Sequence, residues 1–142
     1  DVCPTTLSDK SLIMKRLGKL SDHLQPIFIT VDPERDTPEV LDHYTAYFHP
    51  RLIGLTGSAA QVKRVADNFK VSYVQNHDPG GDPNLYSIDH SAGMYLLGTD
   101  GSFVTKFAYA ASPTKVADRI RAIIQDADLP PTTRQPYFSG DR

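Results

Sequence analysis

The chain is short of cysteine, of positive charge and of long apolar runs. Its single cysteine, Cys3, excludes a framework of internal disulfides. The net charge of −2 argues against a nucleic-acid-binding domain, which normally shows a basic stripe. No apolar run approaches the roughly 18 residues that a membrane-spanning helix needs, and no signal-peptide pattern is present. Because the chain starts at Asp1 without Met, we expect it to be processed or trimmed, and its residues alone leave the compartment open.

The size and composition are those of one soluble globular domain. A chain of 142 residues can bury a core without disulfides or metals as supports. Hydrophobic residues make up 39% of the chain and charged residues 23%, which is typical of globular proteins. We expect a single domain over residues 1–128, followed by a loose, polar, proline-containing tail over residues 129–142.

Periodicity and capping residues predict helices that alternate with strands. Thr37 followed by Pro38 predicts a helix start, with Val40 among the inward residues, and Ser58 with Gln61 predicts a capping box. Asp100-Gly101 between two apolar runs predicts a hairpin. The expected elements are a helix at 6–20, a strand at 26–31 buried on both faces, a helix at 38–48, a strand at 51–56, a helix at 58–69, a brief extended piece at 71–74, a long polar loop at 75–87, hairpin strands at 93–97 and 103–107, and a helix from 112.

This order indicates an α/β fold, a thioredoxin-like sandwich with a mixed sheet and a C-terminal β-hairpin. Such a fold normally has another strand directly before its first helix. The present chain has no residues for that central strand before Cys3.

Cys3 stands at the expected start of the first helix. The helix dipole lowers the pKa of a thiol in such a position, which makes the thiolate more accessible for metal binding or redox chemistry. Free cysteine is also common as a small buried hydrophobic residue. The Cys3-Pro4 step at the helix start favours a functional role, and both interpretations stay open.

His90 precedes an apolar run, where a histidine is more often a surface or capping residue than a metal ligand. Thiolate and imidazole together are the usual ligands of a soft transition metal. The other four histidines offer no clearer pattern, so chemistry alone does not single one out: His23, His43, His49 and His77.

The loop from Asp32 to Asp36 concentrates charge in five positions. A paired-carboxylate catalytic site is conceivable there. An ion pair of Arg35 that braces the turn is the favoured interpretation, because caps and turns commonly use these residue types.

Three stretches of the chain together resemble one protein family. Residues 1–4, Asp-Val-Cys-Pro, look like the second half of a Cys-x-x-x-Cys-Pro motif, and residues 31–37 look like a signature loop. Asp89-His90, followed by residues 94–101, looks like the family's histidine and hairpin. With all three in order over about residues 1–127, the chain resembles the Sco/SenC family of copper chaperones, thioredoxin-fold proteins that help assemble the copper site of cytochrome c oxidase.

The resemblance implies that Cys3 and His90 are copper ligands. The family's first cysteine would lie four positions before Cys3, off the start of the chain. Two soft thiolates select Cu(I), and an imidazole completes a site that can also hold Cu(II). Donor atoms that share such an ion lie roughly 3–4 Å apart, so we expect Cys3 and His90 on the same face.

The resemblance also implies partners and a location. The partners are the copper-site subunit of cytochrome c oxidase and other copper chaperones or thioredoxin-like reductants, with no nucleic acid. The location is the periplasmic face of a bacterial inner membrane or the mitochondrial inner membrane, with room for a membrane tether upstream of Asp1.

Other functions are compatible with the sequence. A thiol-disulfide oxidoreductase acting on partner cysteines would use Cys3 as its catalytic residue, but such an enzyme needs no distant histidine, so His90 favours the chaperone. A peroxidase is weaker, because the residues after Cys3 do not support it. A folded remnant without activity is the last alternative.

Overall fold

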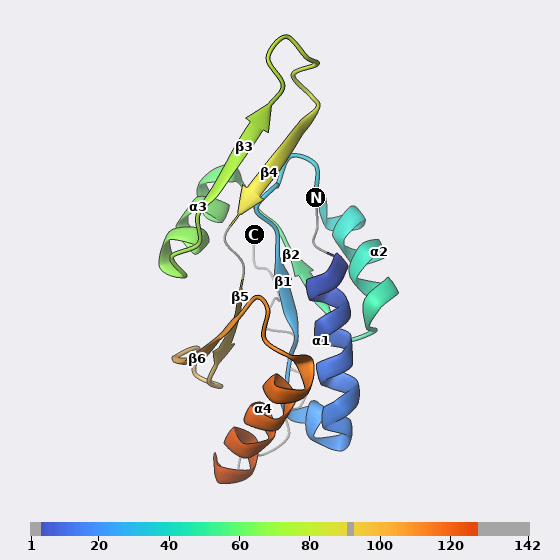
Figure 1. Ribbon diagram of the computed structural model, residues 1–142, viewed down its shortest axis with the longest axis vertical. Coiled ribbons are helices and arrows are strands. Elements are labelled where there is room, and N and C mark those ends of the chain that lie inside the picture. The colour runs from blue at the N-terminus through green and yellow to red at the C-terminus, as the bar shows by residue number, and fades with distance from the viewer. Residues whose placement is uncertain (1–3, 91–92, 128–142) are drawn as a thin grey trace, which may run out of the picture.

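The computed structural model describes residues 4–90 and 93–127, which fold into helices and short strands (Figure 1). The expected tail at 129–142 lies outside these residues. In chain order the elements are α1 (Pro4–Leu17), the 3-10 helix η1 (Gly18–His23), β1 (Ile27–Ile29), α2 (Pro38–Phe48), β2 (Ile53–Leu55), α3 (Ala59–Asn68), β3 (Tyr73–His77), β4 (Tyr86–His90), β5 (Gly93–Leu97), β6 (Phe103–Ala108) and α4 (Pro113–Ala127).

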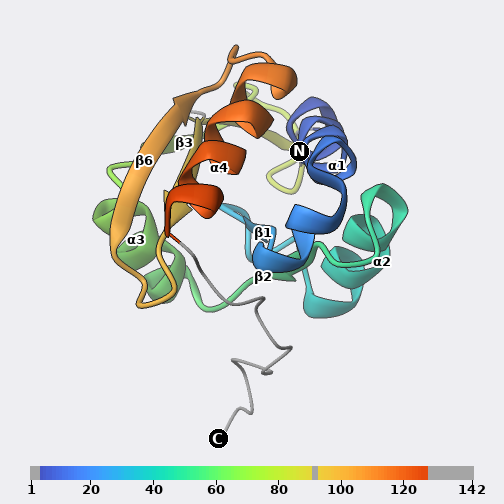
Figure 2. The ribbon, with the colours of Figure 1, turned by 90° about the horizontal axis from the view of Figure 1, so that it is seen from below.

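The main core lies where α1 packs against α4. Apolar residues on one face of each helix are buried there, which matches their helical spacing. Side chains of β5 and β6 pack against the same cluster, so α4 is covered by α1 on one side and by this hairpin on the other (Figure 2). The buried cluster consists of Ile13, Leu17, Val116, Ala117, Ile120 and Ile124.

A second contact is made by α2 and β2. Leu41 and Thr45 on α2 are buried, and the backbone of Gly54 in β2 lies directly beneath them. A Cβ atom at position 54 would stand 2.9 Å from the Cβ of Leu41 and 3.2 Å from Cγ2 of Thr45. Glycine therefore allows a closer approach of helix and strand than any larger residue would.

The strands form three separate pairs within the described part of the chain. β1 and β2 are parallel, with Ile27 opposite Ile53. β3 and β4 are antiparallel, as are β5 and β6. The combination of a parallel pair, antiparallel hairpins and covering helices agrees with the predicted α/β, thioredoxin-like class.

Local end signals were predicted correctly. The side chain of Thr37 accepts a hydrogen bond from the Val40 amide, with Pro38 in the first turn of α2. Ser58 and Gln61 form the capping box of α3.

The first helix, expected over 6–20, instead begins at Pro4 and changes to a 3-10 helix at Gly18. The φ of Gly18 is 57°, the left-handed conformation that ends a helix.

The prediction that the first strand is buried on both faces is wrong. Ile27 and Ile29 are 40% and 38% exposed, because among the described residues β1 is paired only with β2. Val40, expected to point inward from α2, is also largely exposed.

The polar loop expected over 75–87 is also partly wrong. Its two ends are strands, β3 and β4, and only residues 78–85 connect them. Most residues of β3 are exposed, so the segment lacks the alternation of apolar and polar residues that reveals a strand in a sequence. The two strands extend as a ribbon away from the helices in Figure 1.

None of the helices in the described ranges combines the length and apolar character needed to cross a membrane.

Candidate metal centre

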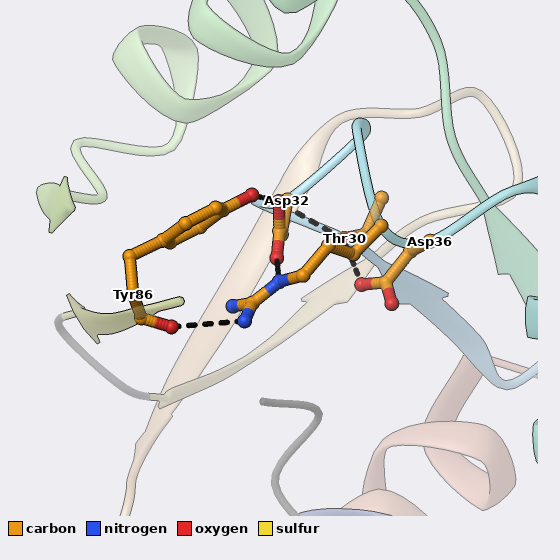
Figure 3. Close-up of polar contacts among 5 residues, drawn as sticks. Thr30, Asp32, Asp36 and Tyr86 are labelled. Atoms are coloured by element: carbon orange, nitrogen blue, oxygen red, sulfur yellow. Dashed lines mark hydrogen bonds and ion pairs between the residues drawn. The ribbon is translucent and has the colours of Figure 1, made fainter. Parts of the chain in front are cut away.

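The loop that follows β1 is fixed by a network of hydrogen bonds (Figure 3). The hydroxyl of Thr30, which is buried, donates to Oδ2 of Asp36 at 2.5 Å and accepts the backbone N–H of Asp32 at 2.9 Å. The backbone N–H of Asp36 also donates to the carbonyl of Asp32 at 3.0 Å. The loop therefore turns back on itself at the carboxyl end of β1.

Asp32 is the centre of this network. It is only 3% exposed, and its carboxylate accepts hydrogen bonds from two side chains. Nε of Arg35 donates to Oδ2 and forms an ion pair with it, while the hydroxyl of Tyr86 donates to Oδ1 at 2.7 Å. Both oxygens of a buried carboxylate are thus partnered, as a buried charge requires.

Tyr86 is held by Arg35 in two further ways. Nη1 of Arg35 donates to the backbone carbonyl of Tyr86 at 2.9 Å. The guanidinium carbon lies 4.0 Å from the centre of the Tyr86 ring, within the range of a cation–π interaction. We call Asp32, Arg35 and Tyr86 the Tyr86 clamp. It joins β4 to the loop between β1 and α2.

The clamp shifts the pKa values of its members in opposite directions. Burial raises the pKa of Asp32, but the hydrogen bonds from Tyr86 and Arg35 and the charge of Arg35 outweigh burial, so its net pKa is lowered. The hydrogen bond to Asp32, together with burial, raises the pKa of Tyr86 to about 12. Asp32 is therefore an anion and Tyr86 a protonated donor at neutral pH.

The bracing interpretation of the loop from Asp32 to Asp36 is confirmed. Arg35 forms the expected ion pair with Asp32, and the other carboxylate of the pair, Asp36, is bonded to Thr30. Each carboxylate thus has its own structural partner.

This pairing leads to an expected pH dependence of stability. A carboxylate whose pKa is lowered in the folded state contributes fully above its unfolded pKa, about 3.9, and loses that contribution as the pH falls through the folded pKa. In a protein that folds with this domain, Asp32→Asn should lower the free energy of unfolding by about 1–3 kcal/mol at pH 7. The difference between wild type and variant should shrink below about pH 4.

Urea unfolding of both proteins over a pH series measures this difference. Asp118→Asn is a matched control, because Asp118 pairs with Arg121 on the exposed surface of α4. A difference between wild type and Asp32→Asn that stays constant down to pH 3 would contradict the lowered pKa.

Cys3, the first predicted ligand, lies outside the described residues. Because α1 begins at Pro4, the position of Cys3 directly precedes the first helical residue. Proline is favoured at that first position, since the missing N–H has no partner in the helix anyway. The expected approach of the Cys3 sulfur to His90 remains a prediction.

His90, the second predicted ligand, ends β4. Its backbone lies opposite Tyr73 of β3, and the strand that carries it begins at Tyr86, inside the clamp. Thus the structure places the backbone of His90 on the strand that is tied to the loop after β1. The part of the chain that the structure describes contains no group of three or more His, Cys, Asp or Glu side chains that could hold a metal ion.

Sequence reasoning missed Tyr86. Its contact with Asp32 joins residues 54 positions apart, and no local spacing rule connects two such positions. The expected polar loop over 75–87 also hid the strand on which Tyr86 lies. The remaining signal was the crowding of charged residues around Arg35, which pointed to the loop but not to its partner.

The chain is similar in sequence to known proteins of one family. A model of the SCO1/SenC family matches residues 1–125. An SCO2-like protein of Rickettsia conorii is 42% identical over 121 residues, which cover 85% of this chain and 58% of the relative. The human mitochondrial SCO2 homologue is 38% identical over 123 residues, which cover 85% of this chain and 46% of the relative. The chain thus spans about half the length of these relatives.

A solved structure shares both sequence and fold with this chain. The structure of Bradyrhizobium japonicum ScoI with copper bound is 38% identical, with a TM-score of 0.73. The match covers 86% of this chain and 76% of that chain. The similarity therefore extends over most of the described fold and is not confined to the short motifs.

Proposed function

This chain belongs to the SCO1/SenC family, and from that membership we propose that it is a copper-binding metallochaperone domain. The observation that carries the proposal is its similarity to a ScoI protein whose structure contains copper. Copper is the cargo of such a domain. The proposed recipient is the binuclear copper site of cytochrome c oxidase, where the domain delivers copper or prepares the cysteines.

Cys3, His90 and a thiolate upstream of Asp1 are the proposed ligands. Thiolates favour Cu(I), and the imidazole of His90 allows the same site to hold Cu(II). The arrangement of the described elements supports this set. The first turn of α1, the carboxyl end of β1 and the end of β4 all lie near the middle of the long axis of the molecule (Figure 1).

The proposed partners follow from the same membership. They are the oxidase subunit that carries the copper site, other copper chaperones and thioredoxin-like reductants. Relatives include a mitochondrial protein and bacterial proteins, and we place this chain at the periplasmic face of a bacterial inner membrane or at the mitochondrial inner membrane.

Thiol-disulfide exchange is the alternative function. The position of Cys3 directly before α1 supports it, because a helix start lowers the pKa of a thiol and raises its thiolate fraction. This function needs the two thiols and makes no use of His90. Substitution of His90 therefore separates the two candidates.

The test uses a protein that extends upstream to both thiolates. Substitution of a residue that only supports a metal ligand lowers metal affinity by about 10–100-fold. His90→Ala removes a ligand itself, so it should weaken Cu(II) binding by a larger factor. Binding of Cu(I) should change little, since two thiolates remain. Competition against Cu(II) and Cu(I) chelators measures both affinities.

His43→Ala is the matched control, because His43 lies exposed on α2. It should bind both ions as the wild type does. Equal Cu(II) affinity for wild type and His90→Ala would remove His90 from the site and leave thiol-disulfide exchange as the better proposal.

A further inference from the structure

The β3–β4 ribbon is poorly supported by its own contacts. It consists of two strands, and most of β3 is exposed. An isolated two-stranded ribbon is marginally stable in water. The position of β4 relative to the rest of the molecule therefore depends on the points at which side chains attach it to the body of the fold.

Tyr86 supplies one such attachment by three separate interactions. Its hydroxyl reaches Asp32 at 2.7 Å, its carbonyl accepts from Arg35 at 2.9 Å, and its ring lies under the Arg35 guanidinium. Asp32 is buried and belongs to the braced loop after β1. The anchor thus belongs to a loop that is held by hydrogen bonds of its own.

Tyr86 and His90 lie on the same strand, at its two ends. Four residues of extended chain span about 13 Å, at roughly 3.3 Å per residue. Tyr86 is therefore too distant to touch an ion held at His90, and it acts through the direction and position of the strand. An anchor at one end of a short strand limits where the other end can move.

We propose that Tyr86 is a positioning residue for copper capture, in that its hydroxyl bond to Asp32 fixes β4 so that His90 meets the thiolate site. The proposal rests on the proposed function, in which His90 is a ligand of Cu(II). It assigns a role to a residue that belongs neither to the thiol motif nor to the ligands. The described link between the clamp and His90 is the strand β4.

Tyr95 provides an unusually close control for Tyr86. Its hydroxyl also donates a hydrogen bond, to the carbonyl of Phe69 at 2.8 Å, and a cation, Lys106, also lies over its ring, at 5.2 Å. It stands on β5, in the other antiparallel hairpin. Replacing either tyrosine by phenylalanine removes one hydroxyl and keeps the ring.

The experiment compares Tyr86→Phe and Tyr95→Phe in the protein that contains both thiolates. Tyr86→Phe should weaken Cu(II) binding on the order of tenfold, as loss of an outer-shell support does. It should also change the copper hyperfine splitting in the electron paramagnetic resonance spectrum, while Cu(I) affinity stays within about twofold because the thiolates are untouched. Tyr95→Phe should show wild-type copper affinities and spectrum even where it lowers the melting temperature.

Hydrogen exchange of the metal-free protein gives a second measurement. Tyr86→Phe should speed exchange of the β4 amides relative to wild type, and Tyr95→Phe should leave them unchanged. If Tyr86→Phe fails to fold, Arg35→Lys replaces it. Lysine keeps the charge but loses the planar group that bonds Asp32 through Nε, stacks on Tyr86 and bonds its carbonyl. Two of the three attachments of Tyr86 are then lost, so the same changes are expected.

The outcomes separate this proposal from the proposed function. If wild type shows a Cu(II) spectrum that depends on His90 and Tyr86→Phe keeps that spectrum and affinity, the positioning role is overturned and the copper function stands. If Tyr95→Phe changes the spectrum as much as Tyr86→Phe does, the effect is general loosening and the proposal is again overturned. If wild type shows no Cu(II) binding that depends on His90, the proposed function fails and the positioning role fails with it.

Discussion

Replacing the cysteine that the family motif places four positions before Cys3 by serine is expected to weaken Cu(I) binding on the order of 10²–10⁴-fold. The chain itself contains one cysteine, so a lone thiolate, Cys3, would have to hold a soft ion without its chelating partner. Two thiolates four positions apart can share an ion, since binding to the first raises the effective concentration of the second. Loss of either removes both a soft ligand and this chelate advantage.

Competition with a Cu(I) chelator measures the effect in a protein that extends upstream of Asp1. Cys3→Ser should lose about as much affinity as the upstream substitution, because the two sulfurs contribute equally to the pair. A serine introduced at Thr6, in the second half of the first turn of α1, is the control that leaves both thiolates in place. Equal Cu(I) affinity with one thiolate and with two would show that the upstream cysteine is not a ligand.

A polypeptide that consists of residues 1–142 alone is not expected to unfold as a cooperative monomer. Among the described residues β1 pairs only with β2, and β5 pairs only with β6. The thioredoxin-like arrangement places a further strand between β1 and β5. Without it, Ile27 and Ile29 stay 40% and 38% exposed, so each loses about 0.6–1.2 kcal/mol of the about 1.5–3 kcal/mol that full burial contributes. The unpaired backbone groups of β1 and β5 cost about 1–3 kcal/mol each where they are buried, so the total approaches the about 5–15 kcal/mol that stabilises a whole domain.

Thermal unfolding followed by circular dichroism, together with sedimentation of the same sample, tests this expectation. The expected result is a broad transition or self-association through the open strand edges. A matched polypeptide that extends upstream by one strand should unfold in a single sharp transition as a monomer. A sharp monomeric transition of residues 1–142 alone would show that the inferred strand order does not apply.

Much of this fold could be predicted from the sequence because its signals are local. The Thr37-Pro38 helix start, the Ser58–Gln61 capping box and the hairpin around Gly101 each depend on residues within a few positions of one another. The φ of 82° at Gly101 shows why the turn needs glycine there.

The features that escaped prediction depend on distant contacts or on exposed strands. β3 and β4 carry few apolar residues and bury little surface, so their sequence has the composition of a loop. The exposure of β1 depends on which strand lies beside it, and no short window of sequence contains that information. The Tyr86 clamp joins segments that only the folded chain brings together.

The candidate site also has features that the sequence predicted and features that it did not. Chemistry alone left five histidines undistinguished, and the family motifs selected His90 and Cys3. Bracing of the loop by Arg35 was predictable because its partner, Asp32, lies three residues away. The joint presence of Cys3 and His90 at one ion remains a prediction.

The bond between Tyr86 and Asp32 also has a consequence for the order in which the molecule folds. It closes a loop of 54 residues, and α2, β2 and α3 lie within that loop. Closing so long a loop costs conformational entropy, and contacts offset this cost only after the segments between its ends have become compact. We therefore expect the ribbon of β3 and β4 to be among the last parts to dock and the first to detach when the chain unfolds. Contacts that form this late affect the lifetime of the native state more than the speed with which it is reached.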